Sequence, residues 1–480
     1  MNKFKKKQAF IIGAGPAGLT AGCELAKNHN WTVTIVDEET LVGGLSKTTE
    51  YKGCRFDVGP HHFITDNKHI LQWWKSIMGD DFIKLKRFTR IYYKKRFFHY
   101  PLQPLNAIKN LSFIECVQCV SSYAWAILFP KRKVVSIRDF FVNRFGNRLF
   151  LMFFKNYTEK LWGIPCDKIS ADWSAQRIRN FSLFKAIFFA FFGRFFKRYA
   201  PRTIQDEFYY PSLGAGTLWE RVALAIRAHE GNSVVLGETV VALGHDNKKI
   251  IAVTTNIGTR YLADYFFSTM TLSDLVHALD PIAPAHVLAA AKALRCRHLI
   301  TINLIVNKSD ICPDHWLYIH EPNVEHIRMG NMNNFSISMV DNPAHSALSF
   351  EYFVFAGDQL WNKPDTELIA LGKREIDILG LAKESDVLGG MVIRALDAYP
   401  IYEENYKEHL HIVRSYLDGF ENLQLIGRNG THSYNNMDAA MLSAMEAVER
   451  VVLSAKQPVQ SEPPWTKTNF LPPHPSRKML

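Results

Sequence analysis

Three glycines near the start of the chain have the types and spacing that bind the phosphates of a dinucleotide. Gly13, Gly15 and Gly18 form a G-x-G-x-x-G pattern between the apolar run 9–12 and a predicted helix over 19–26. In a Rossmann unit the first glycine permits the tight turn, the second lets backbone approach the pyrophosphate, and the third lets the helix pack on the strand. The start of that helix would offer free N–H groups to phosphate.

A second predicted strand, 32–36, ends in Asp37. An acidic residue about twenty positions beyond such glycines suits a pair of ribose hydroxyls, and its charge disfavours the extra phosphate of NADP. The alternative is a glycine-rich turn without a ligand, which the strand–turn–helix context disfavours.

Further glycine-containing stretches follow, Gly43-Gly44-Leu45-Ser46 and then Phe56-Asp57-Val58-Gly59. With them the chain resembles the FAD-binding superfamily of amine oxidases, protoporphyrinogen oxidase and UDP-galactopyranose mutase. Its members share GxGxxG, an acidic residue, a GG pair and FD-x-G. The resemblance implies that the dinucleotide is FAD rather than NAD, with NAD(P)H as a candidate reductant.

Six stretches in the same order resemble one branch of this superfamily, UDP-galactopyranose mutase and especially its eukaryotic-type members. They are 56–63, 90–102, 157–178, 316–335, 398–402 and 427–441. The resemblance implies chemistry through flavin N5, which attacks the anomeric carbon of a nucleotide-diphosphate sugar without net redox. The protein would then position the sugar and neutralise the diphosphate.

Carried over position by position, the resemblance implies a set of site residues. Arg177 and Arg328 match two diphosphate arginines, Tyr318, Tyr399 and Tyr434 match phosphate-binding tyrosines, and His61 matches a histidine beside the flavin. Gly59, Gly427, Asn436, Met437 and Asp438 join the glycine motifs as cofactor contacts. An arginine fork suits phosphate because it can grip two oxygens.

Each of these residues also has a plainer interpretation. Arg177 could be a surface ion-pair member, Tyr399 ordinary core packing, and His61 with His62 polar loop residues. His61 and His62 could form a metal site only with a third ligand, and the sequence offers no obvious one. The sequence also departs from the mutase pattern at Pro60 and at Met437, Ala439 and Ala440, where the flavin ring should lie.

Composition limits the class of protein. The chain has 480 residues, 47% of them hydrophobic, and a formal net charge of +11, which favours a large core, two domains and anionic partners. No nucleic-acid-binding signature is present, so we expect no nucleic-acid partner. Seven dispersed cysteines do not resemble a disulfide framework, so we expect the reducing environment of the cytoplasm. The Cys116/Cys119 pair has no further cysteine or histidine pair that would complete a zinc site.

One Phe-rich segment, 184–199, has basic flanks. It is either a buried helix or flap, or a peripheral contact with the inner surface of a membrane. We expect neither a signal peptide nor a transmembrane helix, because the N-terminal basic residues run directly into the Rossmann strand and no apolar stretch reaches about 20 residues.

The pattern of elements predicts an α/β fold with a Rossmann-type FAD-binding domain assembled from discontinuous segments and an inserted mixed α+β substrate domain. The FAD-binding parts are predicted at 1–75, 205–268 and 386–455. The substrate parts are predicted at 76–204 and 269–385, with 90–101 as two strands around a basic turn. The Pro-rich tail 456–480 is expected to be disordered.

Three functions stay open on the sequence. The first is a mutase-like flavoenzyme acting on a nucleotide-diphosphate sugar. The second is an FAD-dependent oxidoreductase acting on an apolar or lipid-linked substrate, as protoporphyrinogen oxidase or polyene desaturases do. The third is an FAD-stabilised scaffold without activity.

Overall fold

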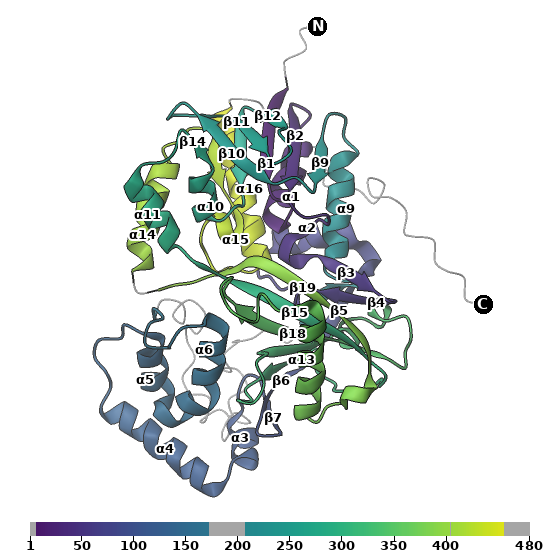
Figure 1. Cartoon of the computed structure of the whole chain (residues 1–480), viewed down its shortest axis with the longest axis vertical. Helices are drawn as coiled ribbons and strands as arrows, with labels where there is room; N and C mark the ends of the chain where they lie inside the picture. Colours follow the sequence, from purple (N-terminus) through teal and green to yellow (C-terminus); the bar gives the residue numbers. More distant parts are fainter. Residues whose placement is uncertain (1–5, 172–206, 404, 456–480) are drawn as a thin grey trace, which may run out of the picture.

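A five-stranded parallel sheet gathers segments that are far apart in the chain (Figure 1). The computed structural model describes residues 6–171, 207–403 and 405–455. The sheet order is β20 (Leu423–Leu425), β13 (Tyr265–Ser268), β1 (Lys7–Ile12), β2 (Trp31–Asp37) and β9 (Ser233–Leu236). The predicted Rossmann-type architecture built from discontinuous segments is therefore confirmed.

Three helices cover this sheet. They are α1 (Pro16–Ala26), α9 (Gly216–Arg227) and α16 (Met437–Ser454), and α1 packs against both others. The apolar run of β1 is buried, with Ile11 inaccessible to solvent, as expected for a parallel strand covered on both faces. Helix α1 begins three residues earlier than predicted because Pro16 occupies its first turn, where proline needs no N–H partner.

A smaller sheet lies beside the Rossmann sheet. It contains β12 (Arg260–Leu262), β11 (Ile250–Thr255), β10 (Val240–His245) and β14 (Leu279–Asp280). Helices α10 (Leu272–His277), α11 (Ala285–Ala293) and α14 (Tyr406–Leu417) pack together next to it. Leu243, Leu275 and Val413 are buried in their shared core.

A seven-stranded mixed sheet forms the second main layer. Its order is β19 (Val387–Pro400), β15 (Cys296–Val306), β18 (Ser346–Val354), β17 (Arg328–Asn331), β16 (Trp316–Ile319), β6 (Thr89–Tyr93) and β7 (Arg96–His99). Only β16 and β6 run parallel within it. The predicted hairpin over 90–101 is confirmed as β6 and β7, and α13 (Asp365–Ile378) packs on β15 and β19.

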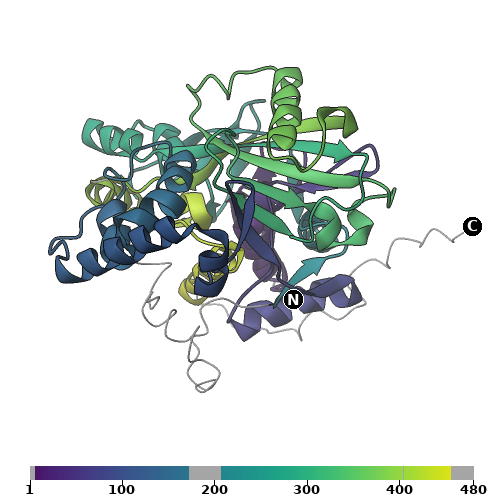
Figure 2. The ribbon, with the colours of Figure 1, turned by 90° about the horizontal axis from the view of Figure 1, so that it is seen from below.

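Helices from the first third of the chain lie to one side of this mixed sheet, as the view from below shows (Figure 2). They are α3 (Pro104–Asn110), α4 (Phe113–Leu128), α5 (Ile137–Leu149), the π-helical turn Phe150–Lys155 and α6 (Asn156–Trp162). Helix α2 (Lys68–Met78) lies apart from them and packs against α9 and α16. The remaining elements are the pairs β3 (Thr48–Tyr51) with β4 (Cys54–Asp57) and β5 (Phe82–Lys86) with β8 (Glu207–Pro211), and the short helices α12 (Met332–Phe335) and α15 (Gly427–Gly430). Within the described ranges no helix has the length and apolarity needed to cross a bilayer.

Candidate functional site

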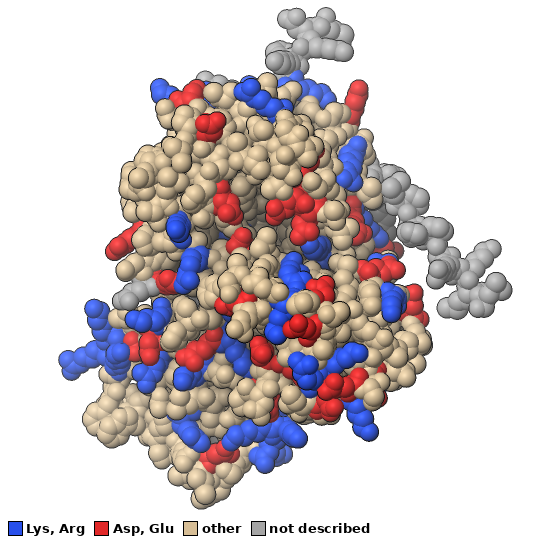
Figure 3. Space-filling model, viewed as in Figure 1, with Lys and Arg blue, Asp and Glu red and all other residues tan. Residues whose placement is uncertain are grey.

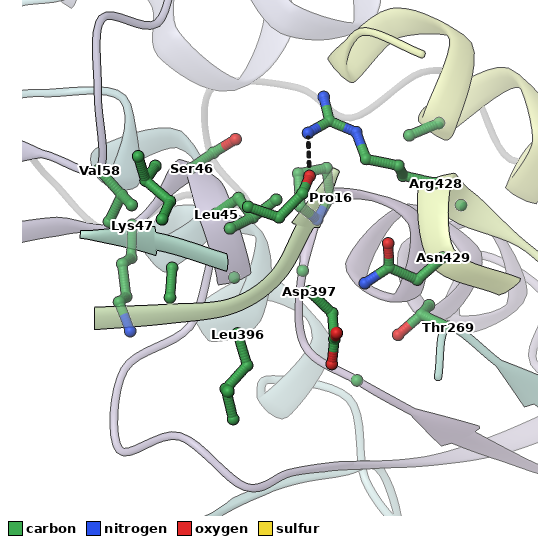
Figure 4. A pocket seen from close by; sticks show the side chains of 18 of the residues that line it. Pro16, Leu45, Ser46, Lys47, Val58, Thr269, Leu396, Asp397, Arg428 and Asn429 are labelled. Carbon is green, nitrogen blue, oxygen red and sulfur yellow. Dashed lines mark hydrogen bonds between the residues drawn. The ribbon is translucent and has the colours of Figure 1, made fainter. Parts of the chain in front are cut away.

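A cavity of about 1080 Å³ lies between the Rossmann sheet and the mixed sheet. Its walls combine the glycine turn after β1, the loop after β4, strands β17 and β19, and the segment 427–440. Figure 4 shows Ser46 and Val58 on one side of this cavity and Thr269 and Asn429 on the other. The topology therefore brings together stretches separated by more than 400 positions, because the N-terminal and C-terminal segments share one sheet.

Two positions of the glycine turn, Gly13 and Gly18, leave no room for a side chain. A Cβ on Gly13 would lie 2.0 Å from the Thr269 hydroxyl oxygen, and φ is +101° there. A Cβ on Gly18 would lie 1.9 Å from the Gly13 carbonyl oxygen. Gly15 caps α1 and faces Gly44, whose Cα would lie 3.8 Å from a Cβ on Gly15. The start of α1 is thus open to the cavity, as a phosphate-binding turn requires.

A second helix also begins at the cavity. Asn436 precedes α16 without a side-chain cap, and Asn436, Met437 and Asp438 line the wall. Gly427 has φ +75° and approaches α1 closely, because a Cβ on it would lie 2.9 Å from the Ala17 Cβ. The N-termini of α1 and α16 therefore both face the space where an anionic group would bind.

Asp37 holds the glycine turn as well as lining the cavity. Its Oδ2 accepts a hydrogen bond from the Ala14 N–H at 2.5 Å, and its Oδ1 accepts one from the Glu39 N–H at 2.8 Å. Burial raises the pKa of Asp37, while the two backbone N–H groups act in the opposite direction. The carboxylate thus has a positioning role that the sequence pattern did not suggest.

His61 is held in one tautomer by the loop around it. Its Nε2 donates to the Leu45 carbonyl at 2.7 Å and lies 3.2 Å from the Val58 carbonyl. Burial lowers the pKa of His61 to about 4, although the Leu45 carbonyl favours the charged form. The ring is therefore neutral at physiological pH, and Nδ1 is its acceptor. Both Pro60 and His61 line the cavity.

Arg328 and Glu351 form an ion pair across β17 and β18. Arg328 donates from Nη2 to Glu351 Oε2 and, at 3.3 Å, to the Tyr399 hydroxyl. Burial opposes the charge of Arg328, but Glu351, Tyr399, Tyr157 and Tyr318 together outweigh burial and raise the pKa of Arg328 well above its ordinary value. Arg328 Nε and Glu351 Oε1 are buried without a hydrogen-bond partner among the described residues. Gly59 makes room for this pair, because a Cβ on it would lie 3.1 Å from the Glu351 carboxyl carbon.

An aromatic stack continues from this pair. The rings of Tyr399 and Tyr434 stack at 4.9 Å between centroids, and the Arg428 guanidinium lies 4.8 Å from the Tyr399 centroid. Burial raises the pKa of Tyr399, but Arg328 and Arg428 outweigh burial, so the net pKa lies below its usual value. Tyr318 enters the same cavity from β16.

Arg428 also ties the cavity wall together. Its Nη2 and Nη1 donate to the Asn435 and Ala398 carbonyls at 2.6 and 2.8 Å. Figure 4 shows Arg428 on the same side as Asn429, with Asp397 of β19 below it. Burial raises the pKa of Asp397 to about 6, and Asp274 and Glu38 add to that effect.

Most of the residues predicted for the site lie in this one cavity. These are Gly13, Gly15, Asp37, Gly44, Leu45, Ser46, Gly59, His61, Tyr318, Arg328, Tyr399, Gly427, Tyr434, Asn436, Met437 and Asp438. Gly18 lies beneath the turn and Gly43 behind it, with its N–H donating to the Ala14 carbonyl. Arg177, the segment 184–199 and the tail 456–480 lie outside the described residues.

Glu351 and Arg428 contact the predicted residues in the cavity but were not themselves predicted. Glu351 stands alone as a charge in the otherwise uncharged strand SALSFEYFV, and that isolation was an available signal. Arg428 lies inside the stretch 427–441, but its contact with the stacked tyrosines depends on tertiary structure. The described ranges contain no cluster of three His, Cys, Asp or Glu side chains that could hold a metal ion. Cys116 and Cys119 are free thiols on α4.

Comparison with known proteins defines the class of fold. Residues 11–77 match the family model described as NAD(P)-binding Rossmann-like domain. The structure is similar to that of reduced UDP-galactopyranose mutase, with a TM-score of 0.79 and 19% identity over 94% of this chain and 95% of that one. It is also similar to a putative protoporphyrinogen oxidase from Exiguobacterium sp. 255-15, with a TM-score of 0.72 and 16% identity over 93% and 99% of the two chains.

Curated relatives are similar over shorter stretches. The 1-hydroxycarotenoid 3,4-desaturase of Flavobacterium sp. (strain P99-3) is 26% identical over 53% of this chain and 54% of its own length. The phytoene desaturase (neurosporene-forming) of Cereibacter sphaeroides is 35% identical over 16% of this chain and 14% of its own length. The probable UDP-galactopyranose mutase of Klebsiella pneumoniae is 26% identical over 34% of this chain and 43% of its own length. The alignments thus span about half or less of these relatives.

The chain thus has a Rossmann-like domain, within a fold that it shares with UDP-galactopyranose mutase and a putative protoporphyrinogen oxidase. The predicted resemblance to UDP-galactopyranose mutase and protoporphyrinogen oxidase is confirmed at the level of the fold.

Proposed function

We propose that the chain is an FAD-dependent enzyme whose substrate carries a diphosphate group, in the manner of a nucleotide-diphosphate sugar. The glycine turn, Asp37 and the start of α16 would hold the FAD. Two features of the cavity fit the pyrophosphate of FAD. The first is the close backbone approach at Gly13 and Gly18, where a Cβ would clash, and the second is the pair of helix N-termini that face the same space. When bound, FAD supplies the flavin ring, with N5 as its reactive atom.

The position and charge of Arg328 are the main support for a substrate with a diphosphate group. It lines the cavity, remains positively charged, and keeps its Nε without a partner among the described residues while Nη2 binds Glu351. An unsatisfied buried N–H is costly, and a phosphate oxygen would satisfy it. Tyr399 adds a hydroxyl 3.3 Å from the same guanidinium.

The other residues would orient and enclose the substrate. Tyr318 and Tyr434 line the same cavity and offer hydroxyls to phosphate or sugar. Neutral His61 would act as a polar contact beside the flavin rather than as a cation, because its pKa lies at about 4. Arg177 remains a proposed second diphosphate contact from the sequence resemblance.

Binding experiments test the diphosphate site directly. The flavin is first released from purified protein by denaturation and identified, and UDP is then titrated into the intact protein by calorimetry. We expect released FAD and saturable UDP binding, which Arg328→Lys weakens at least ~10-fold by losing bidentate contacts. Arg260→Lys, at an exposed position on β12, is the matched control. Unchanged UDP affinity in Arg328→Lys would refute the assignment.

Turnover tests the type of reaction. Protein reduced with dithionite is incubated anaerobically with UDP-hexopyranose, and the nucleotide sugars are separated by chromatography. We expect a furanose isomer to form without consumption of further reductant. Failure to form any isomer, with flavin and UDP bound, would argue against the mutase-like reaction.

The second candidate is oxidation of an apolar substrate, which the two desaturase relatives favour. Leu299, Trp316 and Leu396 line the cavity and could contact such a molecule. A desaturation transfers two electrons and two protons from a saturated C–C unit to the oxidised flavin. Anaerobic bleaching of the flavin by a polyene precursor would support this reaction, and unchanged absorbance would exclude that precursor as substrate.

A further inference from the structure

Helix α4 lies at the lower edge of the molecule (Figure 1), and its outer side is apolar. The exposed large side chains on and just after it are Phe113, Ile114, Val117, Val120, Trp125, Ile127, Leu128 and Phe129, with exposures from 47% for Val117 to 83% for Phe113. Contiguous apolar surface of this kind is uncommon on soluble proteins and marks an interaction site.

The inner side of α4 is firmly anchored, so the outer side is an ordered surface. Cys119 and Ala126 are buried, and α4 packs against α5. The two helices approach closely at Gly146, where a Cβ would lie 2.7 Å from the Tyr123 nitrogen. A capping box of Ser112 and Glu115 fixes the start of α4.

Basic residues border this surface at both ends. Residues 94–138 contain eight Lys or Arg and a single acid, Glu115. Lys94, Lys95, Arg96 and Lys109 are exposed near the start of α4, where Lys94 pairs with Glu115 at 2.9 Å and Arg96 donates to the Asn110 carbonyl. Lys131, Arg132 and Lys133 are exposed just beyond its end. Figure 3 shows blue side chains gathered beside the largely tan lower edge where α4 lies.

A small groove joins the apolar and basic parts at the end of α4. It has a volume of about 280 Å³, and Trp125, Phe129 and Lys131 line it. The Trp125 and Phe129 rings lie 4.4 Å apart. An exposed tryptophan beside lysine is typical of protein surfaces at the boundary between lipid headgroups and acyl chains.

We propose that α4 and its basic ends dock onto the surface of an anionic lipid bilayer. A helix of 16 residues is about 24 Å long, which is shorter than the hydrocarbon core of about 30 Å. The helix therefore lies along the interface, with Phe113, Val120 and Leu128 inserted and the Lys and Arg side chains in contact with acidic headgroups. The basic residues at both ends favour an anionic surface over a second, equally basic copy of this chain. The proposal is independent of the substrate and of the segment 184–199.

Sedimentation of the full chain with vesicles tests this docking. The vesicles contain phosphatidylcholine alone or with phosphatidylglycerol. We expect binding to the anionic vesicles, weakened at least ~10-fold by Phe113→Ser/Val120→Ser/Leu128→Ser and at least ~10-fold by Lys131→Gln/Arg132→Gln/Lys133→Gln. The matched control Ile257→Ser/Leu262→Ser/Ile282→Ser removes equally exposed apolar side chains elsewhere and should bind as the unmodified chain does.

Fluorescence locates the contact without relying on the triple variants. Lipids brominated on the acyl chain should quench tryptophan emission, and Trp125→Phe should remove most of the quenched component. The proposal is overturned if the full chain ignores anionic vesicles, as it would if another part of the chain covers α4. It is also overturned if Trp125 is not quenched, or if the α4 variants abolish self-association rather than vesicle binding.

Discussion

Arg328 and Glu351 are directly opposed on the antiparallel strands β17 and β18, and their side chains pair inside the cavity. The strand register thus places a guanidinium and a carboxylate at the same depth, next to the loop that carries His61. Glu351 supports the charge of Arg328 and leaves Nε available for a ligand.

Removing only one partner should be costly. Arg328→Met leaves the carboxylate of Glu351 buried without its counter-charge, so we expect the free energy of unfolding to fall by about 3–5 kcal/mol. The double variant Arg328→Met/Glu351→Met should be closer to the unmodified chain, because no buried charge is left. Chemical denaturation of both variants measures the difference. A double variant that loses as much stability as Arg328→Met, or more, would contradict a coupled pair.

The glycine turn should be intolerant of a single methyl group. Gly18→Ala places its Cβ in the Gly13 carbonyl, so we expect loss of flavin from the purified protein, measured as the ratio of flavin to protein absorbance. Gly357→Ala is the matched control, because nothing lies within 4 Å of its Cβ. Full flavin content in Gly18→Ala would show that the turn is not a close-approach site.

Lowering the pH should destabilise the protein through His61. Its pKa is about 4 in the folded state and 6.5 ordinarily, so the unfolded chain binds more protons between these values. This contribution to stability is complete above pH 6.5 and is lost as the pH falls toward 4, by up to ~3 kcal/mol. In His61→Gln, which keeps an N–H donor for the Leu45 carbonyl, the loss between pH 6.5 and pH 4 should be smaller. Parallel melting curves for the two proteins over this range would count against the prediction.

Asp397 should destabilise the protein as the pH rises, which is the opposite of the effect of His61. Its pKa is about 6 in the folded state against 3.8 ordinarily, so the folded state binds more protons and loses stability as the pH rises from about 4 to 6. Asp397→Asn should therefore raise the melting temperature at pH 7 but not at pH 4. Asparagine tolerates the φ of +47° at this position. A lower melting temperature at pH 7 would disprove the assignment.

Local patterns were sufficient to predict the geometry of the glycine turn and of Asp37 beside it. Gly13, Gly18 and Asp37 lie within one strand–turn–helix–strand unit, where spacing along the chain determines spacing in space. The hairpin β6–β7 was predictable for the same reason. The discontinuous Rossmann sheet was also predictable, because its segments are short, largely apolar runs.

The rest of the site depends on contacts between distant elements. The pairing of Glu351 with Arg328 depends on the register of β18 against β17, and the position of Arg428 depends on how segment 427–440 meets β19. The exposure of the apolar face of α4 could not be predicted from the sequence either, since an apolar helix is more often buried. Only the tertiary structure distinguishes those two environments.

A titration of UDP into the flavin-loaded protein, followed by its visible absorption spectrum before and after reduction with dithionite, tests the central claim most directly. If the flavin and the diphosphate share this cavity, UDP at micromolar concentration should shift the spectrum of the reduced flavin. A dissociation constant in that range corresponds to a binding free energy of roughly −8 kcal/mol. Arg328→Lys should abolish that shift without lowering flavin content. A flavin spectrum that is indifferent to UDP would contradict the account and favour an apolar substrate in the same cavity.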